Sequence, residues 1–381
     1  MTSERLLLGP GPSPVSARVM RALSEPVLSH LDPEMMAILD DVRRRLDWTF
    51  GAGTGASSLL ISGTGTSGME AAVANVTRPG ARVLTVVTGY FGDRLAQIFQ
   101  RYGAEVARLD VEWGRACDPA AVERALAAAP ADIVAVVHAE TSTGVLNPVQ
   151  EIARIAAASG ALTVVDAVTS LGGLPLRTED WAIDVCYSCS QKGLGAPSGM
   201  APISFSARAL AQRVASRSFY LDLSLLEDYW IRRKYHHTIS APLVYAVREA
   251  LTVIEEEGLE DRWARHRRNH LALAAGLEAL GLSLLPPAPE RLWTLNAVKV
   301  PDGVDEAAVR RRLLEEFSIE IGAGLGPLAG RVWRVGIMGA GSTLSNVLLF
   351  VTALERVLSA MGHRTASPSA AVTAAESAVT K

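Results

Sequence analysis

From about residue 57 to residue 188 the sequence alternates between two kinds of segment. Short apolar runs rich in β-branched residues are separated by helix-like stretches; the runs lie at 58–62, 82–88, 105–109, 132–138, 162–166 and 185–188, and the helix-like stretches at 68–76, 93–103, 118–128 and 151–160. This alternation predicts an α/β fold with a mostly parallel sheet and helices on both faces. Such sheets bind ligands beyond the carboxyl ends of their strands, so we expect the functional residues directly after the apolar runs.

The pattern changes on either side of this region. A helix is predicted at 33–50, with Asp32 as its N-cap and Pro33 in its first turn. After about residue 240 a long helical stretch leads into a shorter mixture of helices and strands. We therefore expect an N-terminal arm, a large domain, a smaller α+β domain and a mobile tail without a periodic apolar face, at 1–20, 21–255, 256–362 and 363–381.

Composition narrows the classes of function. The 381 residues are 49% hydrophobic and 20% charged, and the formal net charge is −3. This balance does not supply the basic surface that nucleic acid or an anionic membrane would attract. The expected partners are therefore small molecules or other subunits, with no nucleic acid and no membrane.

The cysteines and the N-terminus indicate where the protein works. Cys117, Cys186 and Cys189 show neither a disulfide framework nor metal-ligand spacing, which suits a reducing compartment. The apolar run of three leucines at 6–8 is too short for a signal peptide, and no window approaches a membrane span. We expect a cytoplasmic protein.

A glycine- and threonine-rich turn follows the first apolar run. The segment Ser62-Gly63-Thr64-Gly65-Thr66 leads directly into a helix-like stretch. Backbone N–H groups at a helix start, together with glycines and hydroxyls, can hold a phosphate dianion. The turn is not a P-loop, because no Gly-Lys-Ser/Thr follows. By itself it indicates only that an anion could bind, since many such turns serve the geometry of the chain alone.

Two charged residues follow later runs. Asp166 ends the apolar run at 162–166, where a carboxylate is costly unless it is paired or caps a loop. Lys192 lies in the segment SCSQKGLGAPSG, among small residues with no other charge nearby, and could otherwise be an ordinary surface lysine. An aspartate, a lysine and a phosphate turn are the parts that hold pyridoxal 5′-phosphate. The lysine condenses with its aldehyde, and the aspartate keeps its pyridine nitrogen protonated.

Further motifs occur in a consistent order: LLLGPGPSP, SGTGTSGMEAA, HAETSTGVLNP, VVDAVTSLGG, YSCSQKGLGAPSG, KYHHTI and GAGLGPLAGRVWRVGIMG. With these motifs the chain resembles the class V aminotransferases, which are pyridoxal-phosphate enzymes of fold type I. It is most similar to the alanine:glyoxylate and serine:pyruvate (or serine:glyoxylate) aminotransferases. The resemblance extends over all but the terminal tail. It implies a seven-stranded type of large-domain sheet and pyridoxal 5′-phosphate as the cofactor.

The resemblance assigns the centre of the site. Lys192 would be the lysine that bonds to the cofactor, and Asp166 the partner of its pyridine nitrogen. The phosphate would be held by Thr64, Gly65 and Thr66.

Four more residues are implied around the ring. Gln191 would assist beside the lysine, Thr141 would lie beside the ring, and Phe91 would stack on it where animal alanine:glyoxylate enzymes have tryptophan. Phenylalanine keeps the stacking face and loses the indole N–H. Arg334 would clamp the substrate α-carboxylate, a task suited to a guanidinium. Phe91 could instead belong to the core, and Arg334 to a structural ion pair.

The motif KYHHTI points to a second subunit. By resemblance Tyr235 and Thr238 would reach the cofactor phosphate of the neighbouring subunit, which implies a homodimer. The same cluster could be an ordinary dimer interface. The adjacent pair His236 and His237 could suggest a metal, but neighbouring side chains on an extended segment point apart, so we expect no metal site.

The expected reaction is transamination between a small amino acid, alanine or serine, and glyoxylate, which gives pyruvate or hydroxypyruvate plus glycine. Ureidoglycine:glyoxylate transfer is a rival, although the resemblance associates asparagine with the position of Tyr235 in such enzymes; 2-aminoethylphosphonate:pyruvate transfer is another. A desulfurase would need a cysteine on a mobile loop, and none of the three is so placed. A catalytically silent relative that only binds the cofactor would need neither Lys192 nor Arg334, so the presence of both argues against this alternative.

Overall fold

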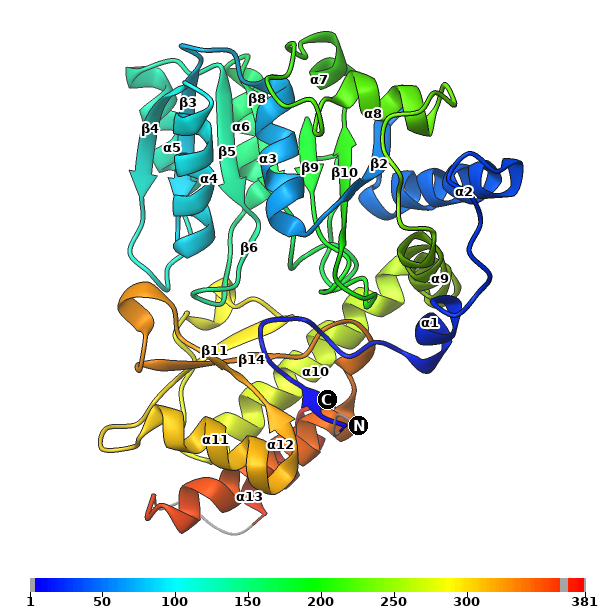
Figure 1. The fold of residues 1–381 in the computed structure, drawn as a ribbon. Helices are drawn as coiled ribbons and strands as arrows, with labels where there is room; N and C mark the ends of the chain where they lie inside the picture. The colour runs from blue at the N-terminus through cyan, green and yellow to red at the C-terminus, as the bar shows by residue number, and fades with distance from the viewer. Residues whose placement is uncertain (1–3, 364–368, 380–381) are drawn as a thin grey trace.

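The computed structural model describes residues 4–363 and 369–379. Its largest element is a seven-stranded sheet in the order β2-β10-β9-β8-β5-β3-β4 (Figure 1). The strands in this order are β2 (Ser57–Ser62), β10 (Met200–Phe205), β9 (Val185–Tyr187), β8 (Leu162–Asp166), β5 (Ile133–Val137), β3 (Arg82–Val87) and β4 (Glu105–Asp110). Only β10 runs antiparallel to its neighbours. The six apolar runs in the sequence are confirmed as strands; β10 was not predicted, and its Pro202 lacks the N–H group that strand pairing uses.

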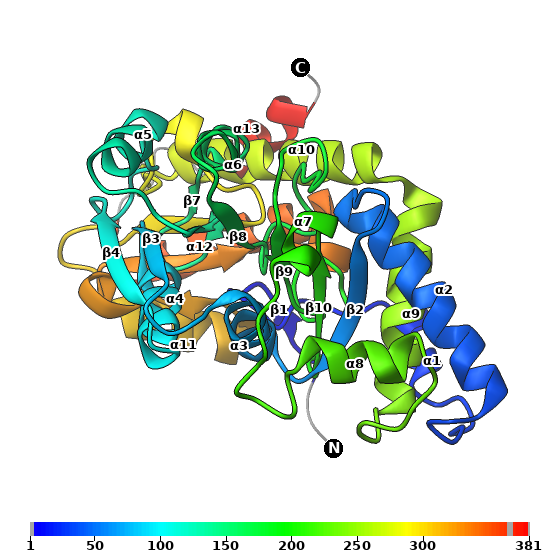
Figure 2. The ribbon, with the colours of Figure 1, turned by 90° about the horizontal axis from the view of Figure 1, so that it is seen from above.

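Helices cover both faces of this sheet. Figure 2 shows α3 (Gly65–Val76) and α4 (Tyr90–Arg101) on one side, and α5 (Pro119–Ala128) and α6 (Val149–Ala158) on the other. The strands between them are buried on both faces, as the continuous apolar runs require. A hairpin of β6 (Ala139–Glu140) and β7 (Val145–Leu146) follows β5.

Four further helices surround the edge of the sheet near β2. They are α2 (Pro33–Phe50), α7 (Ala207–Ala211), α8 (Leu223–Trp230) and α9 (Ala241–Glu257). The predicted N-cap is confirmed, because an Asp32 carboxylate oxygen accepts a hydrogen bond of 2.8 Å from the Glu34 N–H. Helix α2 ends at Gly51, whose φ of 61° lies in the left-handed region.

The chain from Leu259 onward forms a smaller layer below the large sheet (Figure 1). Its sheet has the order β11-β14-β13, with β11 (Leu295–Lys299), β14 (Val332–Gly336) and β13 (Gly322–Ala323). It is accompanied by α10 (Leu259–Ala279), α11 (Glu306–Phe317) and α12 (Leu344–Ala360). Helices α9 and α10 are separated at Gly258, close to the boundary that we placed at 256.

The end of the chain differs from the expected tail. Residues Ala370–Val379 form helix α13, whose Ala371 and Ala375 are buried in the core of the small domain. Gly276 of α10 permits the close approach, because a Cβ there would lie 3.2 Å from the Ala371 carbonyl oxygen. The apolar face of α13 is built largely from alanine, so the sequence showed no large periodic side chains. Residues 364–368 and 380–381 of the expected tail lie outside the described residues.

The N-terminal arm links the smaller layer to the part of the chain around the large sheet. Strand β1 (Leu6–Leu7) pairs in parallel with β12 (Ile319–Glu320) of the small domain, and α1 (Ala17–Ala22) packs on α9. Between them, the Ser13 N–H donates to the Gln191 carbonyl oxygen at 3.0 Å. The arm therefore passes over the loop that carries Lys192. Across the described ranges, no helix combines the length and the apolar character that crossing a membrane requires.

Candidate active site

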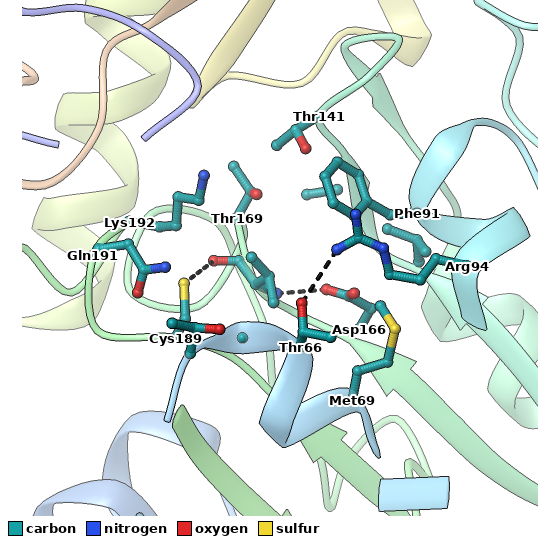
Figure 3. Close-up of a pocket in the computed structure, with 15 residues that line it drawn as sticks. Thr66, Met69, Phe91, Arg94, Thr141, Asp166, Thr169, Cys189, Gln191 and Lys192 are labelled. Carbon is teal, nitrogen blue, oxygen red and sulfur yellow. Dashed lines mark hydrogen bonds between the residues drawn. The ribbon is translucent and has the colours of Figure 1, made fainter. Parts of the chain in front are cut away.

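A cavity of about 170 Å³ lies at the carboxyl ends of β5 and β8 and at the start of α3 (Figure 3). This is the edge of the sheet where the alternating pattern predicts ligand binding. Most of the predicted site residues line it together: Thr64, Gly65, Thr66, Phe91, Thr141, Asp166, Gln191 and Lys192. Arg334, Tyr235 and Thr238 are not among its lining residues.

Asp166 is the last residue of β8 and is 2% exposed. One carboxylate oxygen accepts a hydrogen bond of 2.8 Å from the Val168 N–H, and the other accepts one of 2.9 Å from the Tyr187 hydroxyl. Among the residues that the structure describes, no cation forms an ion pair with this carboxylate. Burial raises the pKa of Asp166 to about 7.

Tyr187 was not predicted as part of the site. It is fully buried on β9, and the parallel register of β8 and β9 sets it beside Asp166. The apolar run at 185–188 contained the signal, because a tyrosine hydroxyl in a buried strand needs a hydrogen-bond partner. Only the register identifies that partner as the carboxylate.

Lys192 reaches the cavity from the loop between β9 and β10, and its neighbours restrict it closely. Its ammonium donates a hydrogen bond to the Pro10 carbonyl oxygen of the N-terminal arm. Gly11, with a φ of 107°, leaves the space that the lysine side chain fills, because a Cβ there would overlap it. Burial lowers the pKa of Lys192, and the nearby positive charge of Arg334 lowers it further.

The turn before α3 contains backbone N–H groups that are available to a ligand. Thr64 is the N-cap of α3, but its side chain makes no capping hydrogen bond. The Gly65 and Thr66 N–H groups have no acceptor within the described part of the chain. A Cβ at Gly65 would lie 3.2 Å from a Val168 methyl group and 3.3 Å from Cys189, so glycine lets the turn lie close to the cavity wall. These are the features of an anion site at a helix start.

Glu140 fixes the start of α4 and thereby the position of Phe91. Its buried carboxylate accepts hydrogen bonds from the N–H groups of Phe91 (3.2 Å), Gly92 (3.1 Å) and Ser142 (3.1 Å). A Cβ at Gly89 would overlap the Glu140 side chain. Burial raises the pKa of Glu140. The motif HAETSTG contains both Glu140 and Ser142, but the Phe91 and Gly92 N–H groups come from the start of α4, and the sequence did not show them as partners of Glu140.

Arg334 lies on β14 of the small domain and is 8% exposed. Its Nε donates to the Ala323 carbonyl oxygen at 2.6 Å. No carboxylate in residues 4–363 or 369–379 forms an ion pair with it, so the alternative of a structural ion pair does not describe this arginine. Burial lowers its pKa to about 10. A buried guanidinium without an anion is suited to binding one from a ligand.

Tyr235 and Thr238 lie on the surface of this chain, and Tyr235 is 63% exposed. Their segment nevertheless touches the strand that leads into the phosphate turn, because His237 Nε2 lies 2.9 Å from the Ser62 hydroxyl. His236 and His237 do not point to opposite sides as we expected. Their ring centroids are 5.0 Å apart, and both rings contact Tyr220, because the chain here is not a regular strand.

The cavity also contains residues that were not assigned to it. Met69, Arg94, Val137, Ala139, Val168, Thr169 and Cys189 line it. Cys189 faces the cavity (Figure 3), but burial raises the pKa of its thiol to about 12, which keeps it from acting as a thiolate nucleophile at neutral pH.

These groups fit the cofactor that we predicted. Asp166 is a buried carboxyl with no ion-pair partner in the part of the chain that the structure describes, and a protonated ring nitrogen would supply one. Free amide donors at Gly65 and Thr66 suit a phosphate, and Lys192 offers an amine whose lowered pKa favours its neutral, nucleophilic form. The fit therefore depends on charged groups and hydrogen-bond donors that have no partner within the described chain.

Comparisons with known proteins identify the family of the chain. The family model described as aminotransferase class-V matches residues 7–331. The alanine–glyoxylate aminotransferase of Drosophila melanogaster is 37% identical over 364 residues, which cover 93% of this chain and 92% of the relative.

Solved structures are similar over nearly the whole chain. An alanine–glyoxylate aminotransferase from Nostoc sp. has a TM-score of 0.92 and 44% identity, covering 94% of this chain and 96% of that one. A ureidoglycine–glyoxylate aminotransferase from Bacillus subtilis has a TM-score of 0.96 and 39% identity, covering 100% of this chain and 99% of that one.

The raised pKa of Asp166 predicts how pH affects the cofactor-free protein. The folded state holds this proton up to about pH 7, whereas an unfolded aspartate releases it near pH 4. Folded protein therefore binds more protons between these values, and this group's contribution to stability falls as pH rises from about 4 to about 7. Asp166→Asn lacks the titration but can still pair with Val168 and Tyr187. Its melting temperature relative to wild type should rise from pH 5 to pH 7 and then level off.

Calorimetry of cofactor-free wild type and Asp166→Asn at several pH values measures this difference. Asp302→Asn, at an exposed position, is the matched control and should stay parallel to wild type. Parallel curves for Asp166→Asn as well would contradict the buried, unpaired state of this carboxyl.

Proposed function

Because the chain belongs to the class V aminotransferase family, we propose that it transfers the amino group of alanine or serine to glyoxylate, giving pyruvate or hydroxypyruvate plus glycine. The family makes it a transaminase that uses pyridoxal 5′-phosphate, and its fold is fold type I. The observation that supports the proposal is a buried amine, Lys192, close enough to a buried carboxyl, Asp166, and a buried guanidinium, Arg334, for both charges to affect its pKa. Neither Asp166 nor Arg334 has an ion-pair partner among the described residues.

Each of these groups has a distinct task. The bound cofactor supplies a ring that accepts electrons from the α-carbon of the substrate. Asp166 holds the positive charge on the ring nitrogen, which the cavity would otherwise disfavour. Arg334 binds the substrate α-carboxylate. Lys192, once free, moves the α-proton, because its lowered pKa keeps a larger share of the amine neutral at physiological pH.

The N-terminal arm supports a small substrate. Pro10 touches the Lys192 amine, and Gly336 of β14 lies so close to the arm that a Cβ there would overlap the Gly9 carbonyl oxygen. Gly322 is equally close to the Pro10 ring. The arm thus fills the space between Lys192 and the strand of Arg334, which leaves little room for a long side chain.

The names of the similar proteins support glyoxylate as the acceptor. The Nostoc and Drosophila proteins are named for alanine and glyoxylate, and the Bacillus protein for ureidoglycine and glyoxylate. Glyoxylate is common to these names, and the amino donor differs. Transfer from ureidoglycine is therefore the second candidate, favoured by the similarity of the Bacillus structure over the full chain.

We also propose that the enzyme works as a homodimer in which Tyr235 and Thr238 complete the neighbouring subunit's site. Both are exposed here, yet their segment contacts Ser62 beside the phosphate turn. Phe219, 74% exposed, adds apolar surface next to His236. Exposed aromatic side chains of this kind favour contact with another subunit.

The remaining parts of the proposal concern location and partners. The cysteines at 117, 186 and 189 are all free and buried, which supports the cytoplasmic location that we propose. The net charge of −3 gives no support to nucleic acid as a partner.

A donor and acceptor screen tests the reaction. Purified enzyme should show its highest kcat/KM with alanine or serine and glyoxylate, compared with ureidoglycine and 2-aminoethylphosphonate and with pyruvate as acceptor. Lys192→Ala should abolish turnover, and Lys299→Ala, at an exposed position on β11, should not. Activity with ureidoglycine alone would select the second candidate, and activity with the phosphonate and pyruvate alone would overturn both.

Arg334→Gln tests carboxylate binding. We expect kcat/KM for alanine to fall about 10²–10³-fold, because charge-assisted hydrogen bonds to the carboxylate are lost. Cofactor absorbance should stay unchanged. The matched control is Arg331→Gln, on an exposed side chain just before β14. Equal kcat/KM in wild type and Arg334→Gln would remove Arg334 from this role.

Mixed dimers test the shared site. One chain carries Lys192→Ala and the other carries Tyr235→Phe with Thr238→Ala. If these residues serve the neighbouring subunit, each mixed dimer holds one intact site. Random pairing should then restore about a quarter of wild-type activity. Activity no higher than that of the two parents would show that the sites are not shared in this way.

A further inference from the structure

Arg94 is a cation in the cavity to which neither the motifs nor the proposed reaction assigns a task. It lies on α4, one turn after Phe91, and lines the cavity. Figure 3 shows its guanidinium between Phe91 and Thr66. Its Nη1 donates a hydrogen bond of 3.2 Å to the Thr66 hydroxyl, and its Cζ lies 5.0 Å from the centroid of the Phe91 ring.

The carboxylates near Arg94 do not pair with it. Burial raises the pKa of Asp166, and the positive charge of Arg94 across the cavity opposes this rise, but within the described residues the two side chains form no ion pair. The neighbouring carboxylate, Asp93, pairs with Arg108 at 2.7 Å and also accepts a hydrogen bond from Gln97. In the described part of the chain, Arg94 itself forms no ion pair. A partly buried guanidinium that is held by one hydroxyl and by aromatic rings can gain an anion without losing a carboxylate partner.

The phosphate turn, by contrast, lacks a positive charge to balance a phosphate. A phosphate monoester carries a charge of about −1.5 to −2 at neutral pH. The Gly65 and Thr66 N–H groups, the hydroxyls of Thr64 and Thr66, and the proposed contributions of Tyr235 and Thr238 are all formally neutral. The cavity's other lining cation, Lys192, makes its hydrogen bond to the N-terminal arm.

We propose that Arg94 is the counter-charge of the cofactor phosphate, supplied by the same subunit that holds the cofactor. Thr66 is both its hydrogen-bond partner and a member of the phosphate turn, so the guanidinium already lies next to the proposed anion site. The inference rests on the proposed role of residues 64–66 as the phosphate turn.

Arg94 also contacts two aromatic residues of α4. The guanidinium packs over Phe91 and Tyr90, with its Cζ 5.2 Å from the Tyr90 centroid. Phe91 is also the residue that we expect to stack on the cofactor ring. Arg94 therefore contacts both the residue that we expect to stack on the ring and a residue of the phosphate turn.

Cofactor binding tests the proposal without relying on turnover. Dissociation constants are measured by absorbance and fluorescence for pyridoxal 5′-phosphate and for pyridoxal, which has the aldehyde and ring but no phosphate. The proteins are cofactor-free wild type, Arg94→Gln, Arg94→Lys and Arg101→Gln. Arg101 is the matched control, because it is an exposed arginine in the last turn of the same helix.

We expect Arg94→Gln to weaken binding of the phosphate form about 10–100-fold, because one or two charge-assisted hydrogen bonds to the phosphate are lost. Binding of pyridoxal should weaken less than about 3-fold, because pyridoxal has no phosphate. Arg94→Lys should recover most of the lost affinity, because it retains the charge, and Arg101→Gln should match wild type. Circular dichroism and thermal melts confirm that each variant is folded.

Four results would count against the proposal in distinguishable ways. Equal weakening of both ligands in Arg94→Gln would assign Arg94 to the ring or to the fold. Unchanged binding of both would show that it has no part in cofactor affinity. If wild type binds neither ligand, the cofactor assignment is wrong. If it binds both equally, residues 64–66 are not a phosphate site. Either result would also overturn the proposed role of Arg94.

Discussion

The carboxyl of Asp166 is buried at the end of β8 with two hydrogen-bond donors and, among the described residues, no ion-pair partner, and the proposed chemistry of the site depends on it. Burial raises its pKa to about 7, so the protein alone stabilises its ionised form poorly. A positive charge on a ligand would reverse this, and in the proposed site the protonated ring nitrogen of the cofactor supplies that charge. The parallel pairing of β8 and β9 places the Tyr187 hydroxyl beside this carboxyl, to which it donates a hydrogen bond.

Several charged groups around the cavity have no ion-pair partner among the described residues, whereas two carboxylates elsewhere are closely paired. Asp93 pairs with Arg108, and the buried Asp184 pairs with Arg208. By contrast, Asp166, Arg94 and Arg334 form no ion pairs within the described residues. In the proposed site, each corresponds to a charge on the ligands: the ring nitrogen, the phosphate and the substrate carboxylate. In the proposed site this pattern would orient both ligands, because each unpaired charge faces an opposite one on a ligand.

The sequence predicted the strands and helices around the site because their patterns are local. Six apolar runs are strands, and the residues that follow them meet at one edge of the sheet. Predictions failed where a pattern was weak or its partners were distant. Helix α13 has an apolar face of alanines, β10 contains a proline, and His236 and His237 lie on an irregular segment where the alternation of a strand does not apply.

The sequence by itself determined which chemical groups stand at the strand ends, because a buried apolar run followed by Asp166, or a small-residue loop around Lys192, is a local property of the chain. Only the tertiary structure decided which charges remain unpaired and what lies over the amine. Arg334 comes from the small domain, Pro10 from the N-terminal arm, and Arg94 from a helix whose start is held by Glu140. Their proximity depends on packing between segments far apart in the chain, which no local pattern encodes.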